Sequence, residues 1–142
     1  DETDECKCYK RDITDALQLN VDEFIRMMRG FTWDSSKIFY IDKYINHNKN
    51  VTNGDFLRML YYVYFDDGKV QLIKTVLKDE FITCQTLAYF LRDFKTDKGK
   101  LKLCRLIKLK DRENIHIIER EFNNYFYREK LVNIFFKLTQ GF

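Results

Sequence analysis

The sequence contains a segment of seventeen residues twice in similar form, and this duplication constrains the fold more than any other feature. Val21–Lys37 reads VDEFIRMMRGFTWDSSK, and Asn53–Lys69 reads NGDFLRMLYYVYFDDGK. In both stretches an apolar segment of helical spacing is followed by an aromatic and acidic turn and then by a lysine. Internal similarity at such a period is typical of stacked repeats, each of which is too small to bury its own apolar face.

The start of each repeat carries a residue that can cap a helix. Asn20, Thr52 and Thr83 recur at spacings of 32 and 31 residues, and their side-chain oxygens can accept hydrogen bonds from the first turn of a helix. Large apolar residues follow four and eight positions after each cap, on one face of the predicted helix. These predicted buried anchors are Phe24 and Met28, Phe56 and Leu60, and Leu87 and Leu91.

A second helix is expected after the turn of each repeat. The turn contains an aspartate followed three residues later by a lysine, in the pairs Asp34 and Lys37, Asp66 and Lys69, and Asp97 and Lys100. The aspartate is interpreted as the N-cap of the second helix. The apolar spacing of that helix begins one residue after each lysine, at Ile38, Val70 and Leu101.

A fourth copy of the pattern diverges from the other three. Asp111 is interpreted as the cap of its first helix, and Tyr127 replaces the aspartate three residues before Lys130. Terminal repeats often diverge in this way.

These patterns predict an all-α fold of about eight short helices, arranged as four stacked helix-turn-helix repeats of ~31 residues in a compact superhelix. The predicted helical repeat domain spans residues 20–142. Residues 1–19 are predicted to form an acidic N-terminal arm that carries Cys6 and Cys8, since residues 1–23 hold eight acids against three bases. The 142 residues include no proline, which suits helices joined by short turns.

The turn motif resembles that of a known family. In Phe65–Leu101, FDDGKVQLIKTVLKDEFITCQTLAYFLRDFKTDKGKL, an aromatic-Asp-Asp turn is followed by the FITCQ segment and a second turn. This stretch is similar to the domain of unknown function 4476, which is found in bacterial and animal proteins, and the resemblance covers most of residues 20–138. It implies a helical repeat, often exported, and no catalytic residues, because the family has no established activity. Residues 108–122 depart from the family pattern.

Three features favour secretion. The four cysteines are interpreted as two disulfides that tie Cys6 and Cys8 to Cys84 and Cys104. Four cysteines allow three connectivities in all, and buried free thiols are the alternative. Asn50 begins the glycosylation sequon Asn-Val-Thr in a predicted loop. The chain does not begin with Met, as expected after removal of a signal peptide. The predicted location is extracellular, and the cytoplasm is the alternative.

Catalytic and metal-binding chemistry finds little support in the sequence. His47 and His116 are the only histidines and fall in different repeats, and serine occurs only at Ser35 and Ser36, without a nucleophile motif. The five glycines form no phosphate-binding loop. The segment that begins at Asp93 does not match a calcium-binding loop, because it lacks oxygen ligands at the required positions and has no closing glutamate. The sequence therefore predicts no enzyme activity, no cofactor and no metal.

Two groups of residues are the candidate binding sites. Residues 95–112 hold eight bases against two acids, and five of the bases are predicted to line one helix side, namely Lys98, Lys102, Arg105, Lys108 and Arg112. An ordinary solvated helix face is the alternative. The aromatic clusters hold more tyrosines than one small core needs, and four are predicted to line a groove between repeats: Tyr62, Tyr64, Tyr125 and Tyr127.

Together these features predict a non-catalytic secreted recognition protein that binds a protein partner, such as an extracellular receptor, or an anionic surface. Nucleic acid is disfavoured because the basic segment lacks aromatic residues for base stacking. No apolar run approaches the ~20 residues of a transmembrane helix. The alternative function is a carrier that holds a small apolar ligand or lipid between the helix layers.

Overall fold

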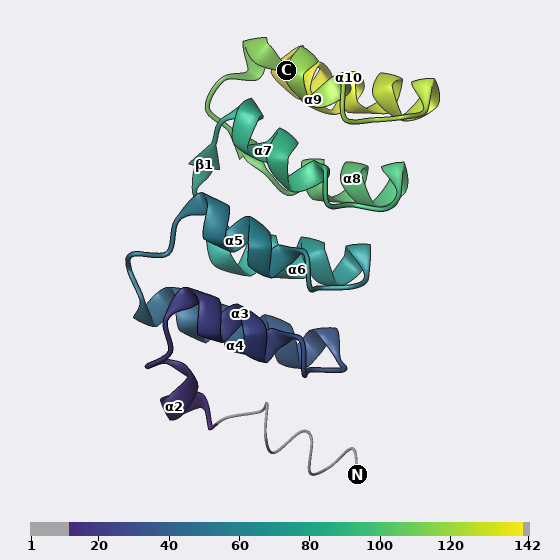
Figure 1. The fold of residues 1–142 in the computed structure, drawn as a ribbon. Coiled ribbons are helices and arrows are strands. Elements are labelled where there is room, and N and C mark those ends of the chain that lie inside the picture. Colours follow the sequence, from purple (N-terminus) through teal and green to yellow (C-terminus); the bar gives the residue numbers. More distant parts are fainter. Residues whose placement is uncertain (1–11, 141–142) are drawn as a thin grey trace. The chain divides into compact units, whose positions relative to one another are not determined.

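The computed structural model describes the backbone of residues 12–140 and the side chains of residues 12–136 (Figure 1). The regular secondary structure of this described part is helical apart from two strands of two residues each, so the predicted all-α fold is confirmed. The chain divides after Val76 into two compact units. The continuous superhelix of four repeats stays a prediction, and each unit is described by itself.

The first unit contains two helix hairpins behind a short leading helix. Its helices are α2 (Ile13–Ala16), α3 (Val21–Met28), α4 (Asp34–His47), α5 (Asn53–Leu60) and α6 (Asp66–Leu77). Helix α3 packs against α5 and α2 packs against α4. The α3–α4 and α5–α6 turns therefore lie at the same end of the unit, and the α4–α5 connection lies at the opposite end (Figure 1).

The second unit also contains two hairpins. Its elements are β1 (Phe81–Ile82), α7 (Cys84–Leu91), α8 (Asp97–Cys104), β2 (Lys108–Leu109), the 3-10 helix η1 (Arg112–Asn114), α9 (His116–Glu119) and α10 (Tyr125–Gln140). Helix α7 packs against α9, and α8 packs against α10, so the first and second helices of the hairpins form two layers. Strands β1 and β2 pair in parallel.

The predicted helix caps are confirmed. The side chains of Asn20, Thr52 and Thr83 each accept a hydrogen bond from the backbone N–H three residues later, at 2.9, 3.1 and 3.1 Å. At the first two caps the third residue of the helix returns a hydrogen bond to the backbone of the cap, which completes a capping box. Local hydrogen bonding thus fixes where α3, α5 and α7 begin.

The predicted anchors are also confirmed as core residues. All six are at most 6% exposed: Phe24, Met28, Phe56, Leu60, Leu87 and Leu91. Burying one such side chain contributes roughly 1.5–3 kcal/mol. The apolar face of each first helix therefore holds its hairpin to its neighbour within each unit.

The predicted role of the turn aspartates is wrong. The second helices begin at Asp34, Asp66 and Asp97 themselves, so each aspartate is the first helical residue and not the cap that precedes it. Thr96 caps α8 by accepting a hydrogen bond from Gly99 N at 3.0 Å. Trp33 occupies the cap of α4 and makes no side-chain cap bond.

Asp34 instead holds the turn of the following hairpin in the first unit. Its two carboxylate oxygens accept hydrogen bonds from the backbone N–H groups of Tyr64 and Phe65, both at 2.9 Å. The buried Lys37, whose Nζ lies 3.7 Å from Asp34, donates to the carbonyl oxygen of Tyr62 at 2.8 Å. We call this arrangement the Asp-Lys clamp. It fits closely, since a Cβ at Gly68 would lie 3.0 Å from Asp34 Oδ2.

The second unit contains the same clamp. The carboxylate of Asp97 accepts hydrogen bonds from the backbone N–H groups of Asn123 and Asn124, the shortest at 2.7 Å. Lys100, 3.4 Å from Asp97, donates to the carbonyl oxygen of Glu121 at 2.6 Å. In these two copies the Asp-x-x-Lys motif is thus an inter-hairpin link rather than a helix cap.

The fourth repeat differs from the others at its first helix. A 3-10 turn and the four-residue α9 replace the eight-residue helix of the other copies. Asp111 occupies the predicted cap position but makes no cap hydrogen bond. Its carboxylate accepts hydrogen bonds from Cys84 N at 2.8 Å and from Asn114 Nδ2 at 2.9 Å, so it ties this segment to the start of α7.

The packed part of the chain begins within the segment predicted as an arm. Ala16 of α2 is fully buried, and the carbonyl oxygen of Leu19 accepts a hydrogen bond of 2.6 Å from the hydroxyl of Tyr44. Cys6 and Cys8 lie outside the described residues. The predicted boundary at residue 20 stays a prediction.

Candidate binding surfaces

The basic segment of residues 95–112 does not form the single helix face predicted for it. Helix α8 ends at Cys104, and Lys98, Lys102 and the capping residue Arg105 are the predicted binding residues that it presents. Lys108 lies on β2 and Arg112 begins η1. All five predicted residues are exposed, namely Lys98, Lys102, Arg105, Lys108 and Arg112. The prediction that the helix continues beyond Cys104 is therefore wrong. The exposure of the bases agrees with a binding surface and equally with an ordinary solvated surface.

The two acids of this segment are occupied by internal hydrogen bonds. Burial alone would raise the pKa of Asp97, but the N–H groups of Asn123 and Asn124 and the charge of Lys100 hold that pKa below its ordinary value. Hydrogen bonds from Asn114 and from the backbone of Cys84 likewise lower the pKa of Asp111. Both carboxylates therefore stay ionised at neutral pH and stabilise the fold, and the segment as a whole carries a formal charge of +6.

Tyr62 and Tyr64 lie at the α5–α6 turn of the first unit. The hydroxyl of Tyr62 accepts a hydrogen bond from Arg29 Nε at 3.1 Å, and the Tyr62 side chain is half-buried. The side chain of Tyr64 is 60% exposed and stacks edge-on against Phe65, with ring centroids 4.8 Å apart. Tyr62 thus braces the turn, and Tyr64 is accessible to a partner.

Three further aromatic side chains of the α3–α4 and α5–α6 turns are exposed, and the sequence did not single them out as binding residues. Trp33, Tyr61 and Phe65 are 68%, 68% and 65% exposed. Trp33 directly precedes Asp34, whose carboxylate binds the backbone of Tyr64 and Phe65, so the clamp brings the two turns together. We call the four residues Trp33, Tyr61, Tyr64 and Phe65 the aromatic turn surface.

Tyr125 and Tyr127 lie at the start of α10 in the second unit. Tyr125 is 71% exposed, whereas Tyr127 is half-buried. Because the two predicted tyrosine pairs belong to different units, a common groove stays a prediction. A hydrogen bond to Glu129 and the negative charge of that residue raise the pKa of Tyr125.

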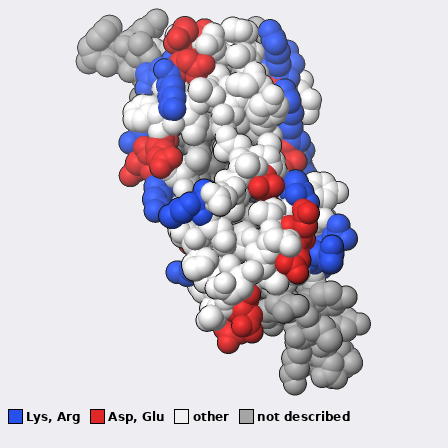
Figure 2. Space-filling view, turned by 60° about the vertical axis from the view of Figure 1, so that its left-hand side comes forward, with Lys and Arg blue, Asp and Glu red and all other residues white. Residues whose placement is uncertain are grey.

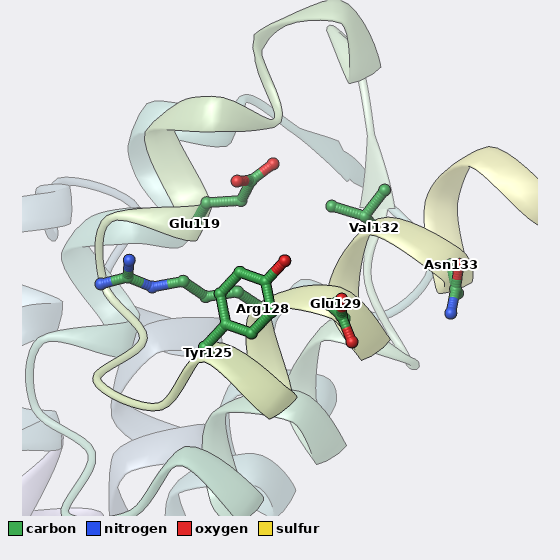
Figure 3. Close-up of a pocket in the computed structure, with 6 residues that line it drawn as sticks. All are labelled: Glu119, Tyr125, Arg128, Glu129, Val132 and Asn133. Atoms are coloured by element: carbon green, nitrogen blue, oxygen red, sulfur yellow. The ribbon is translucent and has the colours of Figure 1, made fainter.

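Tyr125 borders an open pocket of about 540 Å³ (Figure 3). Glu119 from α9 faces residues of α10 across this pocket, which is lined by Glu119, Tyr125, Arg128, Glu129, Val132 and Asn133. Arg128 is fixed on one side, since its Nε donates to the carbonyl oxygen of Phe122 at 2.9 Å. Three of the lining side chains are charged and Val132 is the aliphatic one, so this pocket gives no support to a carrier of apolar ligands.

Cys84 and Cys104 are free thiols buried in the second unit. The Sγ of Cys84 donates to the carbonyl oxygen of Asp111 at 3.1 Å. Burial, followed by the negative charge of Asp111, raises the pKa of Cys84 to about 12, and burial also raises the pKa of Cys104. Both thiols are therefore protonated at neutral pH. The two disulfides to Cys6 and Cys8 stay a prediction.

Asn50 lies in the connection between α4 and α5, and its side chain is exposed. Thr52, the third residue of the sequon, caps α5 through its hydroxyl. The predicted loop position is therefore confirmed, and glycosylation itself stays a prediction.

No metal site is evident in the described residues. Within residues 12–140, no group of three or more His, Cys, Asp or Glu side chains is placed to hold an ion. His47 ends α4 and His116 begins α9, and both side chains are exposed. None of the helices described is both long and apolar enough to cross a bilayer.

Comparison with known proteins places the chain in one family. Residues 49–135 match the model of the domain of unknown function DUF4476, and the chain belongs to this family. The matched residues contain α5–α9 and most of α10, so the family pattern corresponds to the hairpins described above. No curated protein and no solved structure gave a significant match.

Proposed function

We propose that the protein is a secreted, non-catalytic recognition protein that binds a protein partner through the aromatic turn surface of its first unit. The observation that carries this proposal is the exposure of Trp33, Tyr61, Tyr64 and Phe65, each at least 60% accessible, at one end of two linked hairpins. Contiguous exposed aromatic surface is uncommon on proteins that bind nothing.

The aromatic turn surface has the chemistry of a protein interface. Trp and Tyr are enriched among the residues that contribute most to binding, because each buries a large area at a small cost in side-chain entropy. The Asp-Lys clamp holds the backbone of the α5–α6 turn in one conformation before a partner binds. Asp34 fixes the backbone of Tyr64 and Phe65, and Lys37 fixes the carbonyl of Tyr62. Less ordering of the turn is then needed on association, which favours affinity.

An extracellular location is compatible with this surface. Asn50 lies beyond the end of α4 that is distant from Trp33, because the helix of 14 residues runs between them. At 1.5 Å per residue this helix spans about 20 Å. A glycan on Asn50 would therefore leave the aromatic turn surface uncovered (Figure 1).

Site-specific photocrosslinking tests the proposal. A photoreactive phenylalanine analogue replaces Tyr64 in one variant and Tyr89, a 45% exposed residue of α7, in the control. We expect the Tyr64 variant to crosslink one extracellular protein of the native source that the control does not. That protein, once purified, should bind the wild type and lose affinity for a Trp33→Ser, Phe65→Ser variant.

Two results would contradict the proposal. Identical crosslinking patterns from both positions would show that the aromatic turn surface has no selectivity. Equal binding of the purified partner to the wild type and to the double serine variant would show that the contact lies elsewhere. Circular dichroism of the variants establishes that they are folded, since both replaced side chains are largely exposed.

A further inference from the structure

We propose that the second unit carries a separate site for a linear sulfated polysaccharide, formed by the exposed bases of residues 95–112. We call these seven residues the basic strip: Lys95, Lys98, Lys102, Arg105, Lys108, Lys110 and Arg112, all of which are exposed. The eighth base of the segment, Lys100, is 6% exposed and belongs to the clamp.

The basic strip keeps a net positive charge when the two acids of the segment are counted. Both acids are held by hydrogen bonds within the second unit. The Asp97 side chain is 8% exposed, and its oxygens face Asn123, Asn124 and Lys100. Asp111 is engaged by Cys84 and Asn114. The formal charge of the segment is +6, and the seven outward side chains alone carry +7.

The bases of the basic strip fall into two groups along the chain, one on α8 and one after it. On α8, Lys98 and Lys102 are four residues apart and so lie one above the other on the same helix face. After the helix, Lys108 and Lys110 are exposed while Leu109 between them is buried. Alternation of this kind places both lysines on the same side of the extended segment.

A linear polyanion with closely spaced fixed charges can bind the exposed bases of the basic strip. Residues 95–112 contain no aromatic residue, so the strip provides no ring of its own on which nucleic acid bases could stack. The ring of Phe81 on the paired strand lies beneath Lys108, whose Nζ is 5.7 Å from the ring centre. The strip offers one large exposed apolar side chain, Leu106, which is too little to anchor the protein in a bilayer.

Exposed acidic side chains lie near the C-terminal half of the basic strip. Asp79 and Glu80 precede β1, which pairs with β2, and Glu113 follows Arg112 in η1; all three are exposed. Lys98, Lys102 and Arg105 on α8 are separated in sequence from these acids, and they are the part of the strip that a test should change. Figure 2 shows lysine and arginine side chains on the second unit with uncharged surface beside them.

The choice of a sulfated polysaccharide rests on the extracellular location proposed above, where such polymers are the abundant polyanions. The binding itself is measured with purified protein and does not depend on that location. Its failure would leave the aromatic turn surface and its crosslinking test unaffected, so the two proposals fail separately.

The test is titration of the purified chain with a heparin oligosaccharide of defined length and with the same oligosaccharide after desulfation. We expect binding that depends on sulfation and weakens with added salt, because exposed charges are screened. The triple variant Lys98→Gln, Lys102→Gln, Arg105→Gln should bind about tenfold more weakly, from the loss of three exposed ion pairs. All three side chains are exposed, so the variant should keep the fold.

The matched control removes the same charge from the first unit, in the variant Lys43→Gln, Lys49→Gln, Lys74→Gln, whose side chains are also exposed. Its affinity should equal that of the wild type. An equal loss of affinity in both triple variants would contradict the proposed site, because the net charge of the protein alone would then explain binding. Equal affinity for the desulfated oligosaccharide, for polyglutamate or for single-stranded oligothymidylate would overturn the sulfated polysaccharide as the partner.

Discussion

Replacement of Asp97 by alanine should destabilise the second unit by about 3 kcal/mol. The carboxylate accepts backbone hydrogen bonds from Asn123 and Asn124, at 3.0 and 2.7 Å, and lies 3.4 Å from the Nζ of Lys100. A hydrogen bond to a charged group contributes roughly 1.5–3 kcal/mol. Water can reach the two exposed asparagines and recover part of their loss. It recovers less at Lys100, whose side chain is 8% exposed and would keep an uncompensated charge.

Urea denaturation followed by far-ultraviolet circular dichroism measures this loss. Asp79→Ala is the matched control, since Asp79 is exposed and its replacement should change the free energy of unfolding by less than about 0.5 kcal/mol. Amide hydrogen exchange supplies a local measurement. The N–H groups of Asn123 and Asn124 should exchange faster in Asp97→Ala, whereas those of the first unit should not change.

Further variants separate the parts of the clamp. Asp97→Asn keeps one acceptor oxygen but loses the charge, so it should cost less than alanine. Asp97→Ala combined with Lys100→Met removes the isolated charge, and the double variant should be less destabilised than the sum of the two single variants. Wild-type unfolding and exchange in Asp97→Ala would refute the clamp.

Three other outcomes are expected. Because the pKa of Asp97 is lowered in the native state, its carboxylate contributes stability that is fully present above the unfolded-state pKa near 4 and is lost as the pH falls through the native pKa. In urea denaturation series between about pH 5 and 2, the wild type should therefore lose more stability than Asp97→Asn. Phe56→Ala and Leu87→Ala should each cost roughly 2–5 kcal/mol in urea, and Leu106→Ala, at a 44% exposed residue, much less; wild-type-like melting of both core variants would contradict the repeat register. In reduced protein the two buried cysteines should react with iodoacetamide at pH 8 far more slowly without urea than with it, since burial keeps both thiols protonated, and equally fast labelling would show that they are accessible.

Helix caps and core anchors could be predicted from the sequence because their signals are local. Asn20, Thr52 and Thr83 each bind a backbone N–H three residues away, and the apolar residues behind them repeat at helical spacing. These interactions lie within one helix, so a short segment contains all the information that they need.

The role of the turn aspartates could not be predicted in the same way. The sequence revealed the Asp-x-x-Lys motif, but the partners of Asp97 lie 26 and 27 residues further along the chain. A carboxylate just before a helix is a common cap, and local reasoning favoured that role. Only the packing of one hairpin on the next shows that the carboxylate binds a neighbouring turn.

The extent of α8 was mispredicted because two periods overlap in its sequence. Leu101 and Cys104 have helical spacing, and the predicted helix continued through Lys108 and Arg112. The exposed-buried-exposed order at Lys108, Leu109 and Lys110 has the period of a strand, and β2 forms there. Alternation over three residues could not have ended the helix at Cys104, because Lys100, Leu101, Lys102 and Leu103 alternate in the same way inside α8.

The aromatic turn surface was only partly anticipated. Tyr64 was a candidate, but Trp33, Tyr61 and Phe65 were not singled out as binding residues. The repeat itself held the missing signal, since Trp33 and Phe65 occupy the same position, 32 residues apart and immediately before an aspartate. An aromatic residue that recurs in a turn, outside the apolar helix face, is a candidate for exposure.

Secretion is the premise that the partner protein and the sulfated polysaccharide share, and one measurement tests it directly. The intact mass of the protein from its native source is determined before and after reduction with alkylation, and before and after removal of N-linked glycans. We expect a glycan on Asn50 and two disulfides among Cys6, Cys8, Cys84 and Cys104. An unmodified Asn50 together with four free thiols would contradict secretion and leave a helical repeat protein of a reducing compartment.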